Sequence, residues 1–573
     1  MKTKYKYLIL IIVTILASIF IYDYIEKNTM VTVKHDILVV QNDIENKILK
    51  DTNYTIDKPK VILNPYKISP LTALVIFKTN DLASTTVTVK GKDGDDDITN
   101  IFVPSKEHLI TIYGLYPDYE NTVIINSSSE EKVLKIKTDK LPDIITKSNV
   151  YESNSDNFYF TTSVDGYPTA YDKNGNVRWY LNKKYKWDFT RLSNGYILLG
   201  DYNLMREPYY SSSLVEMDLL GKIYYEYVIP GGYHHDVFEK IDGNLILLSN
   251  DFNGSTKEDL IVEIDRNTGE IVKSFDLSKL FKDNKDNWIS LNSITYDGET
   301  NSILAVGKNK DMIINIDYNT GEINWIIADN DKIPSKYQKY LLTGNKNPEF
   351  PIKPQSITLT EGNFAYINSK DNENHLIVYN IDAYNKTFEE VSNYNLGVSG
   401  NNANIDYSDG SFVITQDNLI KKLENNDLST IMEVNTNLYS SKSTKMYAGD
   451  MYVIGSGTRL GNTGITPTTA DHNVIIHKND KSVFKQYNLK FVRDANRLIV
   501  EGTFKNTDKV QVILDNVLSK KTYDVDVTNG KDTISGKKQT ITYINRQGIY
   551  GKYYIYLKVN DVNYKLNKYV NMN

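Results

Sequence analysis

Two adjacent histidines have the clearest potential for chemistry in this chain. The sequence contains seven histidines, and His234 and His235 stand together between the pair Gly231-Gly232 and Asp236. A neutral imidazole can act as a nucleophile or as a base, and a neighbouring carboxylate can orient it. The glycines permit a tight backbone and a strand-like segment follows, so we expect the pair at a junction of loop and strand where side chains reach a cleft. These residues alone leave a second interpretation open, two surface histidines in a loop.

Composition excludes several classes of site. The chain has 573 residues, enough for roughly two to four domains, and its net charge of −6 gives no reason to expect a nucleic-acid partner. The sequence contains no cysteine, which removes disulfides, thiolate nucleophiles and cysteine-based zinc sites. We expect no metal site either, because the acidic run Asp95-Asp96-Asp97 is predicted to be a solvated loop of the first β-domain.

The first 28 residues are typical of an export segment. Residues 1–28 place three lysines before an apolar run, Tyr7–Tyr22. A basic flank followed by about 16 apolar residues fits a signal peptide or an uncleaved signal anchor. We expect a retained membrane anchor with the bulk of the chain outside the cytoplasm, or a secreted protein if the segment is cleaved. A buried core helix is the alternative.

Hydrophobic spacing then predicts three kinds of segment. Residues 29–57 are predicted to be a helical spacer, because apolar residues recur at roughly helical spacing over residues 33–50. Residues 58–145 contain short runs of β-formers separated by turn residues every ten to fifteen positions, a pattern typical of a β-sandwich. Residues 487–573 hold further strand-like runs and are predicted to form a small C-terminal β-domain.

Residues 150–486 carry an internal repeat. One half of the unit is a turn, a glycine and an apolar strand, as in Asp242–Leu248, and the other half places Asp, a turn and Gly between two strands, as in Ile314–Trp325. The halves alternate with a period of roughly 40–60 residues, which is typical of the four-stranded blades of a β-propeller. Six units are clear and a seventh stays open. The predicted fold class is all-β: an N-terminal β-sandwich, a six-bladed β-propeller and a small C-terminal β-domain.

Several of these segments resemble one family, the bacterial aryl-sulfate sulfotransferases. Three runs in the first β-domain and three in the propeller carry the resemblance: Val61–Tyr66, Ser69–Leu74, Gly114–Val123, His234–Asp236, Trp288–Ile294 and Gly321–Ile326. The resemblance implies an exported enzyme with a β-sandwich and a six-bladed propeller. It also implies transfer of a sulfuryl group between phenolic compounds without a nucleotide cofactor, with a histidine that carries the group as a sulfohistidine and a possible homodimer.

The resemblance also assigns roles to residues of this chain. His235, with His234 beside it, stands at the family's first histidine, and Asn292 stands at an asparagine that holds the sulfuryl oxygens. Lys308 stands where the family has an arginine, and keeps the charge without the planar fork.

At two further positions a serine replaces a histidine of the family. Ser290 stands at a histidine in the pattern around Asn292. The pair Gln355-Ser356 replaces a Gln-His pair, so that Ser356 occupies the position of the nucleophile. A serine there would need a base, and His235 is the candidate.

Three functions therefore stay open. The first is a sulfotransferase with His235, His234 and Ser356 as catalytic residues and Asn292, Lys308, Ser290 and Gln355 as substrate-binding residues. The second is a non-catalytic propeller that binds an anionic aromatic, a glycan or a protein partner, and the third is a structural or adhesive surface protein. None of the three requires a cofactor, and the other histidines that follow the site, His375, His472 and His477, are expected to be structural or in solvent-facing loops.

Overall fold

The structure is a computed structural model. It describes residues 37–50, 53–151, 157–162, 166–201, 210–251, 256–282, 287–398, 403–408, 410–424, 426–434, 446–453, 457–461, 481–494, 497–505, 507–516, 518–525, 527, 531–532, 537–545, 549 and 551–571. The predicted anchor, residues 1–28, and His472 and His477 lie outside the described residues. The helices in the described part of the chain are all too short or too polar to cross a membrane. The chain divides into two compact units, of which the larger comprises residues 41–203 and 211–465 and the smaller includes residues 466–573.

The helix expected over residues 33–50 is present as α2 (Ile37–Leu49). Its residue Gln41 donates from Nε2 to the carbonyl of Ile223 at 2.8 Å and accepts the Ile223 N–H at 2.7 Å. Glu45, one turn further along, accepts the hydroxyl of Tyr66 at 2.8 Å. The helix therefore packs on both the β-domain that follows it and a strand far along the chain.

The first β-domain is built on one long strand. Five strands form a single hydrogen-bonded sheet: β1 (Lys60–Leu63), β2 (Ala73–Val89), β3 (Ile98–Ile112), β4 (Glu120–Ser127) and β5 (Glu130–Lys137). The first part of β2 pairs with β1 and β3, and its last part pairs with β3 and β4, with register shifts between Lys78 and Thr85. Alternating residues of β2 and β4, such as Val87, Val89, Val123 and Ile125, are fully buried, as period-two patterning requires.

In the part of the chain that the structure describes, six units of four antiparallel strands follow, and they confirm the predicted repeat. Blade 1 consists of β30 (Tyr447–Gly449), β7 (Phe158–Thr161), β8 (Thr169–Tyr171) and β9 (Val177–Tyr180). Blade 2 consists of β10 (Lys186–Arg191), β11 (Ile197–Gly200), β12 (Ser211–Met217) and the first part of β13 (Ile223–Glu239). Blade 3 consists of the rest of β13, β14 (Leu245–Ser249), β15 (Leu260–Ile264) and β16 (Ile271–Asp276). Blade 4 consists of β17 (Leu291–Asp297), β18 (Ser302–Gly307), β19 (Met312–Asp317) and β20 (Ile323–Ile327). Blade 5 consists of β22 (Ile357–Thr360), β23 (Asn363–Lys370), β24 (Glu373–Asp382) and β25 (Thr387–Val398). Blade 6 consists of β26 (Ala403–Ser408), β27 (Ser411–Gln416), β28 (Leu419–Glu424) and β29 (Asp427–Glu433). A short strand β21 (Thr343–Asn345) lies parallel to β25, and helix α3 (Leu277–Phe281) joins β16 to β17.

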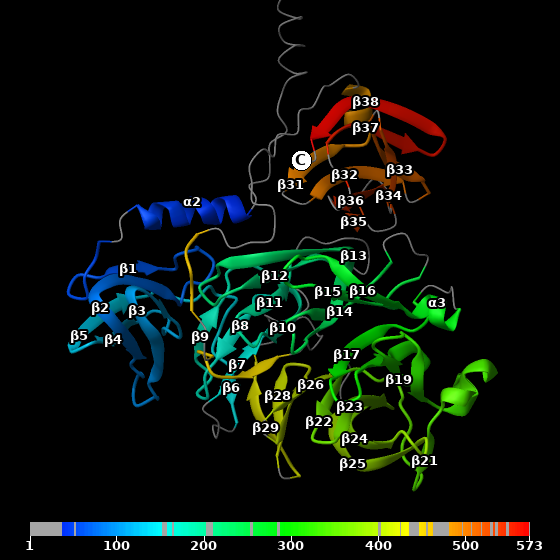
Figure 1. Cartoon of the computed structure of the whole chain (residues 1–573), viewed down its shortest axis with the longest axis horizontal. Helices are drawn as coiled ribbons and strands as arrows, with labels where there is room; N and C mark the ends of the chain where they lie inside the picture. Colours follow the sequence, from blue (N-terminus) through cyan, green and yellow to red (C-terminus); the bar gives the residue numbers. More distant parts are fainter. Residues whose placement is uncertain are drawn as a thin grey trace, which may run out of the picture. The chain divides into compact units, whose positions relative to one another are not determined.

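The two ends of the repeat pair with each other. In blade 1, strand β30 from the end of the repeat pairs with β7 from its beginning, and β6 (Asn149–Val150) adds to β29 of blade 6. In Figure 1 the yellow β29 accordingly lies beside the cyan β6. First strands of neighbouring blades also contact one another, β10 with β13, β13 with β17, β17 with β22 and β22 with β26, so these strands surround the centre of the ring. The fold class predicted from the sequence is confirmed.

The smaller unit is a second β-domain. Its C-terminal part contains α4 (Lys481–Gln486) and two four-stranded sheets. The first consists of β31 (Lys490–Asp494), β32 (Arg497–Lys505), β36 (Lys537–Asn545) and β35 (Lys531–Asp532), and the second of β34 (Lys520–Val525), β33 (Val510–Asp515), β37 (Lys552–Val559) and β38 (Val562–Asn571). Leu498, Val512, Ile555 and Leu557 are fully buried in one core between these strands. The unit therefore has a core of its own.

Candidate active site

Four residues with a left-handed backbone lie at the histidine pair, and His235 is one of them. Trp187, His235, Glu258 and Ser290 have φ angles of 63°, 58°, 55° and 51°. This conformation costs a non-glycine residue on the order of 1–3 kcal/mol and persists where other contacts enforce it. The remaining left-handed residues are mostly Asn, Asp and Lys. Tryptophan, histidine and glutamate in this conformation at one place therefore indicate a site whose side chains are aimed for function.

His235 lies inside β13, not in a loop before a strand. The pairing of β13 shifts between Tyr233 and Val237, and the pairing of β10 shifts in the same way around Trp187. The two rings meet with their centroids 4.5 Å apart. His235 is half-buried, and Trp187 is buried with an indole nitrogen that makes no hydrogen bond in the described part of the chain.

His234 is fully buried and connects His235 to the backbone. Its Nε2 lies 3.1 Å from the carbonyl oxygen of Ser249, and its Nδ1 lies 2.9 Å from Nδ1 of His235. Burial lowers the pKa of His234 below its ordinary value, so the ring is neutral at neutral pH. The interpretation of the pair as two surface histidines is wrong for His234, which is fully buried.

Glu258 is a buried carboxylate next to the pair. The charge of Glu258 is the largest influence that opposes the effect of burial on the pKa of His234. Its backbone is fixed from two sides, because its N–H donates to Oδ1 of Asn250 at 2.5 Å and its carbonyl accepts the N–H of Leu291 at 2.9 Å. Ser290 donates its hydroxyl to Oε2 of Glu258 at 2.7 Å.

Asn292 and Lys308 belong to the same neighbourhood. The hydroxyl of Ser290 lies 3.5 Å from Oδ1 of Asn292, and the carbonyl of Ser290 accepts the N–H of Lys308 at 3.1 Å. Of the seven residues predicted for the site, the structure thus brings together five: His234, His235, Ser290, Asn292 and Lys308.

Ser356 has a structural role that repeats around the ring. Asp236 accepts the N–H of Ile294 at 2.9 Å, Ser293 accepts that of Ile357 at 3.2 Å, and Ser356 accepts that of Ile405 at 3.2 Å. In each case the side chain at one position of a blade binds the backbone of the next blade. Ser356, which is only 2% exposed, is therefore the counterpart of Asp236 and Ser293.

This equivalence also places Gln355. The residues that precede Asp236, Ser293 and Ser356 are His235, Asn292 and Gln355, so Gln355 and not Ser356 is the counterpart of His235 in blade 5. Oε1 of Gln355 accepts the N–H of Ala403 at 3.1 Å, and its Nε2 donates to the hydroxyl of Ser369. Both residues thus tie β22 to its neighbours in the ring.

The sequence interpretation missed Trp187 and Glu258. Trp187-Asp188 stands in blade 2 where His235-Asp236 stands in blade 3, so aligning the repeats residue by residue would have found the tryptophan. No sequence signal indicates Glu258, since its place depends on the left-handed turn that Asn250 enforces. His375, expected in a solvent-facing loop, lies on β24 instead, with its Nδ1 2.9 Å from Oδ1 of Asn393.

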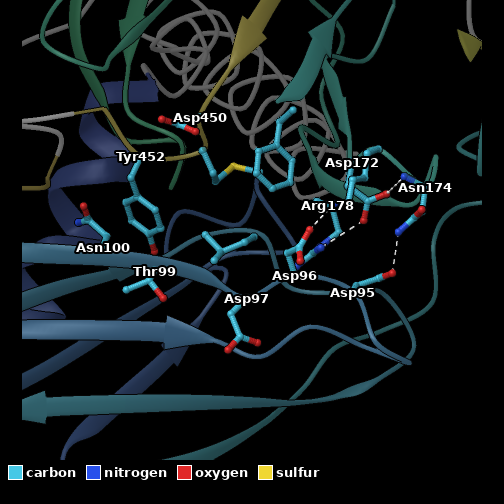
Figure 2. Close-up of a pocket in the computed structure, with 14 residues that line it drawn as sticks. Asp95, Asp96, Asp97, Thr99, Asn100, Asp172, Asn174, Arg178, Asp450 and Tyr452 are labelled. Carbon is cyan, nitrogen blue, oxygen red and sulfur yellow. Dashed lines mark hydrogen bonds and ion pairs between the residues drawn. The ribbon is translucent and has the colours of Figure 1, made fainter. Parts of the chain in front are cut away.

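The acidic run at residues 95–97 is a loop in which Asp96 and Asp97 are exposed, as predicted, and its side chains also bond to neighbouring elements. It lines a cavity of about 400 Å³ between the first β-domain and blade 1, which contains none of the predicted site residues (Figure 2). Asp95 accepts a hydrogen bond from Nδ2 of Asn174 at 2.6 Å, and Asp96 forms an ion pair with Lys173. Asn174 and Lys173 both belong to blade 1. Asp97 pairs with Lys90 in the β-domain itself. The described residues contain no group of three acidic or histidine side chains that could hold a metal ion.

Comparison with known proteins assigns the family. The arylsulfotransferase (ASST) family model matches residues 144–443, and the arylsulfotransferase Ig-like domain model matches residues 60–141. No curated protein sequence matches the chain.

Solved structures give only distant likenesses. The β-propeller domain of Cps50 (Swd1) from Myceliophteria thermophila is 14% identical with a TM-score of 0.31, covering 50% of this chain and 86% of that one. Periplasmic gluconolactonase PpgL of Pseudomonas aeruginosa is 8% identical with a TM-score of 0.32, covering 64% of this chain and 100% of that one. The family assignment depends on the two models, whose matches coincide with the first β-domain and with the six blades: this chain belongs to the arylsulfotransferase family.

Proposed function

We propose that this chain transfers a sulfuryl group between phenolic compounds, at the site around His235 and without a nucleotide cofactor. The observation that carries the proposal is the cluster of four left-handed residues that includes His235. Backbone strain of this kind is retained where it places side chains for binding or reaction.

The polar groups of the site suit an aryl sulfate. Lys308 supplies positive charge and Asn292 a side-chain amide, and donors of this kind stabilise an anionic group in the transition state when their positions are fixed beforehand. The buried indole N–H of Trp187 lacks an acceptor in the described part of the chain, and a sulfuryl oxygen would supply one.

The proposal is tested with p-nitrophenyl sulfate as donor and a simple phenol as acceptor. The full chain should release nitrophenol faster when the acceptor is added, and the variant His235→Gln should lose this release. The variant His375→Gln, which changes a histidine of blade 5 outside the site, should keep it. Release that is unaffected by His235→Gln, or absent from the folded wild-type chain, would exclude the proposal.

A second function, binding without turnover, is favoured by the two serines. Ser290 and Ser356 stand where the family resemblance implies histidines, and their hydroxyls are engaged with Glu258 and with the Ile405 N–H. Saturable binding of p-nitrophenyl sulfate without nitrophenol release, measured by calorimetry, would support this alternative. In either case we propose that residues 1–28 anchor the chain in the cell membrane with the site outside the cytoplasm.

A further inference from the structure

We propose that a groove on the propeller binds an extended peptide segment of a partner protein, in which apolar side chains alternate with lysines or arginines. The groove runs over the turns that follow the first strands of blades 3, 4 and 5, and over strands of blades 4 and 5. Its volume of about 1210 Å³ exceeds the roughly 300–1,000 Å³ of a small-molecule pocket, which favours a longer ligand. The proposed sulfuryl transfer does not use this groove, so the inference goes beyond that function.

The groove lies at the other end of the first strands from the candidate active site. Along β13, His235 belongs to the site and Lys240, just after the strand, lines the groove; five extended residues span about 15 Å. Along β17, Asn292 stands near the beginning and Tyr296, which lines the groove, near the end. A peptide in the groove is therefore not expected to reach the site.

Much of the lining of the groove is apolar. Leu304, Trp325, Leu342 and Phe364 line it, are at most 8% exposed and belong to one hydrophobic core between blades 4 and 5. Further apolar side chains that line it are only half-buried: Phe238, Tyr296, Tyr340, Leu359 and Ile381. Apolar side chains of a ligand would leave water against these residues, which favours binding.

Two exposed apolar side chains stand at turns beside the groove. Ile241, in the turn between β13 and β14, lines the groove and is fully exposed. Tyr384, in the turn between β24 and β25, follows the lining residue Ala383 and is almost fully exposed. Exposed apolar side chains that border an apolar groove are typical of a protein-binding surface.

The charge of the groove is negative once its ion pairs are considered. The charged residues that line it are Glu239, Lys240, Asp297, Glu299, Glu361 and Lys386. Glu239 pairs with Arg266 at 2.6 Å, and Lys240 pairs with Glu263 at 3.1 Å. Three carboxylates and one ammonium group remain, and none of these four forms an ion pair among the described residues. Charge complementarity therefore favours a cationic ligand.

The free polar atoms of the groove also require donors. In the described ranges, the side-chain oxygens of Glu299, Glu361 and Asn324 accept no hydrogen bond, while Nδ2 of Asn324 donates to Asn315 at 2.8 Å. Oxygens of this kind can only accept, so they favour a ligand with N–H groups and positive charge, as lysine or arginine side chains and a peptide backbone supply. An aryl sulfate has neither, so the ligand of the groove differs from that of the site.

The proposal is tested by binding of a labelled peptide to the full chain. The probe is a short fluorescein-labelled peptide in which lysines alternate with leucines and phenylalanines, and fluorescence anisotropy follows binding at physiological ionic strength. We expect saturable binding to one site that weakens as salt is raised. A second probe, with glutamate in place of every lysine, should not bind.

Two variants test whether the peptide lies in the groove. Ile241→Ser removes a fully exposed apolar side chain that the peptide would bury, and should raise Kd about tenfold or more. The double variant Glu299→Gln/Glu361→Gln should raise Kd about fivefold, since each exposed ion pair contributes little. Both changes are at exposed positions, so the variants are expected to fold.

The matched controls change the first β-domain instead. Leu82→Ser removes an exposed apolar side chain there, and Glu130→Gln/Glu131→Gln removes two exposed carboxylates. Both controls should leave Kd unchanged. Binding that weakens equally in the controls and in the groove variants, or that no variant weakens, is adsorption to an acidic protein and overturns the proposal. Equal binding of the glutamate probe overturns it as well.

Competition tests the class of partner. Tetra-N-acetylchitotetraose, a neutral oligosaccharide, offers hydroxyl donors without charge and should not displace the peptide. Displacement, together with loss of oligosaccharide binding in Ile241→Ser, would assign the groove to a glycan and overturn the proposal.

The outcomes are independent of the proposed function. Saturating peptide should leave nitrophenol release unchanged, because the groove and the site around His235 lie at opposite ends of the first strands. A chain that binds the peptide in the groove but never releases nitrophenol contradicts the proposed function alone. A chain that releases nitrophenol but shows no saturable peptide binding contradicts this inference alone.

Discussion

Ser293 and Ser356 hold the same place in successive blades, and this repetition separates a structural hydroxyl from a reactive one. Each accepts a backbone N–H of the following blade, and Ser293 also donates to Asp236. A buried N–H that loses its acceptor costs about 1–3 kcal/mol. A side chain that accepts such an N–H joins two blades of the ring, and this structural role does not require a reactive neighbour.

The variant Ser356→Ala tests this interpretation through stability. We expect the free energy of unfolding to fall by about 1–2 kcal/mol, because the Ile405 N–H is left buried without its acceptor. Ser293→Ala should cost more, since it removes an acceptor and a donor together. Urea denaturation followed by tyrosine and tryptophan fluorescence measures both. Equal stability of Ser356→Ala and the wild type would show that the inter-blade bond contributes nothing.

The site residues show how far the sequence could lead. Histidines and Asn292 were identifiable because their types and spacing match a family motif. Glu258 was not, because its importance comes from a buried position that a left-handed turn and the Asn250 side chain create. The bond from the Ile405 N–H to Ser356 could not be predicted, since a motif aligned on letters does not reveal which side chain bonds to the next blade.

At the scale of elements, β13 explains why the histidine pair could not be placed correctly. The sequence between Gly231 and Asp236 indicates a loop, yet one strand runs from Ile223 to Glu239 and serves blades 2 and 3. Shifts in its pairing near Tyr233 provide the bend that two glycines suggested. The alternation of apolar and polar residues predicted the strands well. The register shifts within a strand could not be predicted in this way, because they depend on the neighbouring strands of the sheet.

Helix α2 is joined to the propeller by buried charges. Glu45 and Lys222 form an ion pair at 2.7 Å with both side chains at most 2% exposed. Asp218, on the same turn between β12 and β13, accepts the hydroxyl of Tyr224 at 3.0 Å and the N–H of Lys222 at 3.0 Å. Burial raises the pKa of Asp218 to about 6.

The raised pKa makes a pH prediction with a definite sign. The folded chain binds the Asp218 proton more tightly than the unfolded chain, so this group lowers the stability as pH rises from about 4 through 6. Asp218→Asn cannot titrate and lacks this loss. We expect the variant to gain on the order of 1–3 kcal/mol relative to the wild type between pH 4.5 and pH 7.5, by urea denaturation at both pH values. Parallel pH dependence of the two proteins would contradict the prediction.

At the scale of the larger unit, the first β-domain and the propeller share a buried seam. Arg178 of β9 donates to the carbonyl of Gly114 from Nε at 2.9 Å and from Nη2 at 2.7 Å, and pairs with Asp172 at 3.2 Å. Its guanidinium lies 3.6 Å from the ring centroid of Tyr116. Figure 2 shows Arg178 beside Asp172 at this seam. The two domains could be separated by sequence pattern, but this contact joins residues 64 positions apart and no local signal reveals it.

Arg178→Lys tests whether this seam makes the two domains unfold together. Lysine keeps the charge but cannot donate in two directions to Gly114 and Asp172 or stack flat on Tyr116. With the site 2% exposed, we expect a loss of about 2–4 kcal/mol in the free energy of unfolding. Lys173→Ala is the matched control, because it removes a partly exposed ion pair with Asp96 across the same seam and should cost less than about 1 kcal/mol. In calorimetry of the wild type, the first β-domain and the propeller should unfold in one shared transition, apart from that of the smaller unit, and in Arg178→Lys this shared transition should be lower or divided. If both variants lose the same stability, or if the larger unit of the wild type already unfolds in two separate steps, Arg178 does not couple the domains.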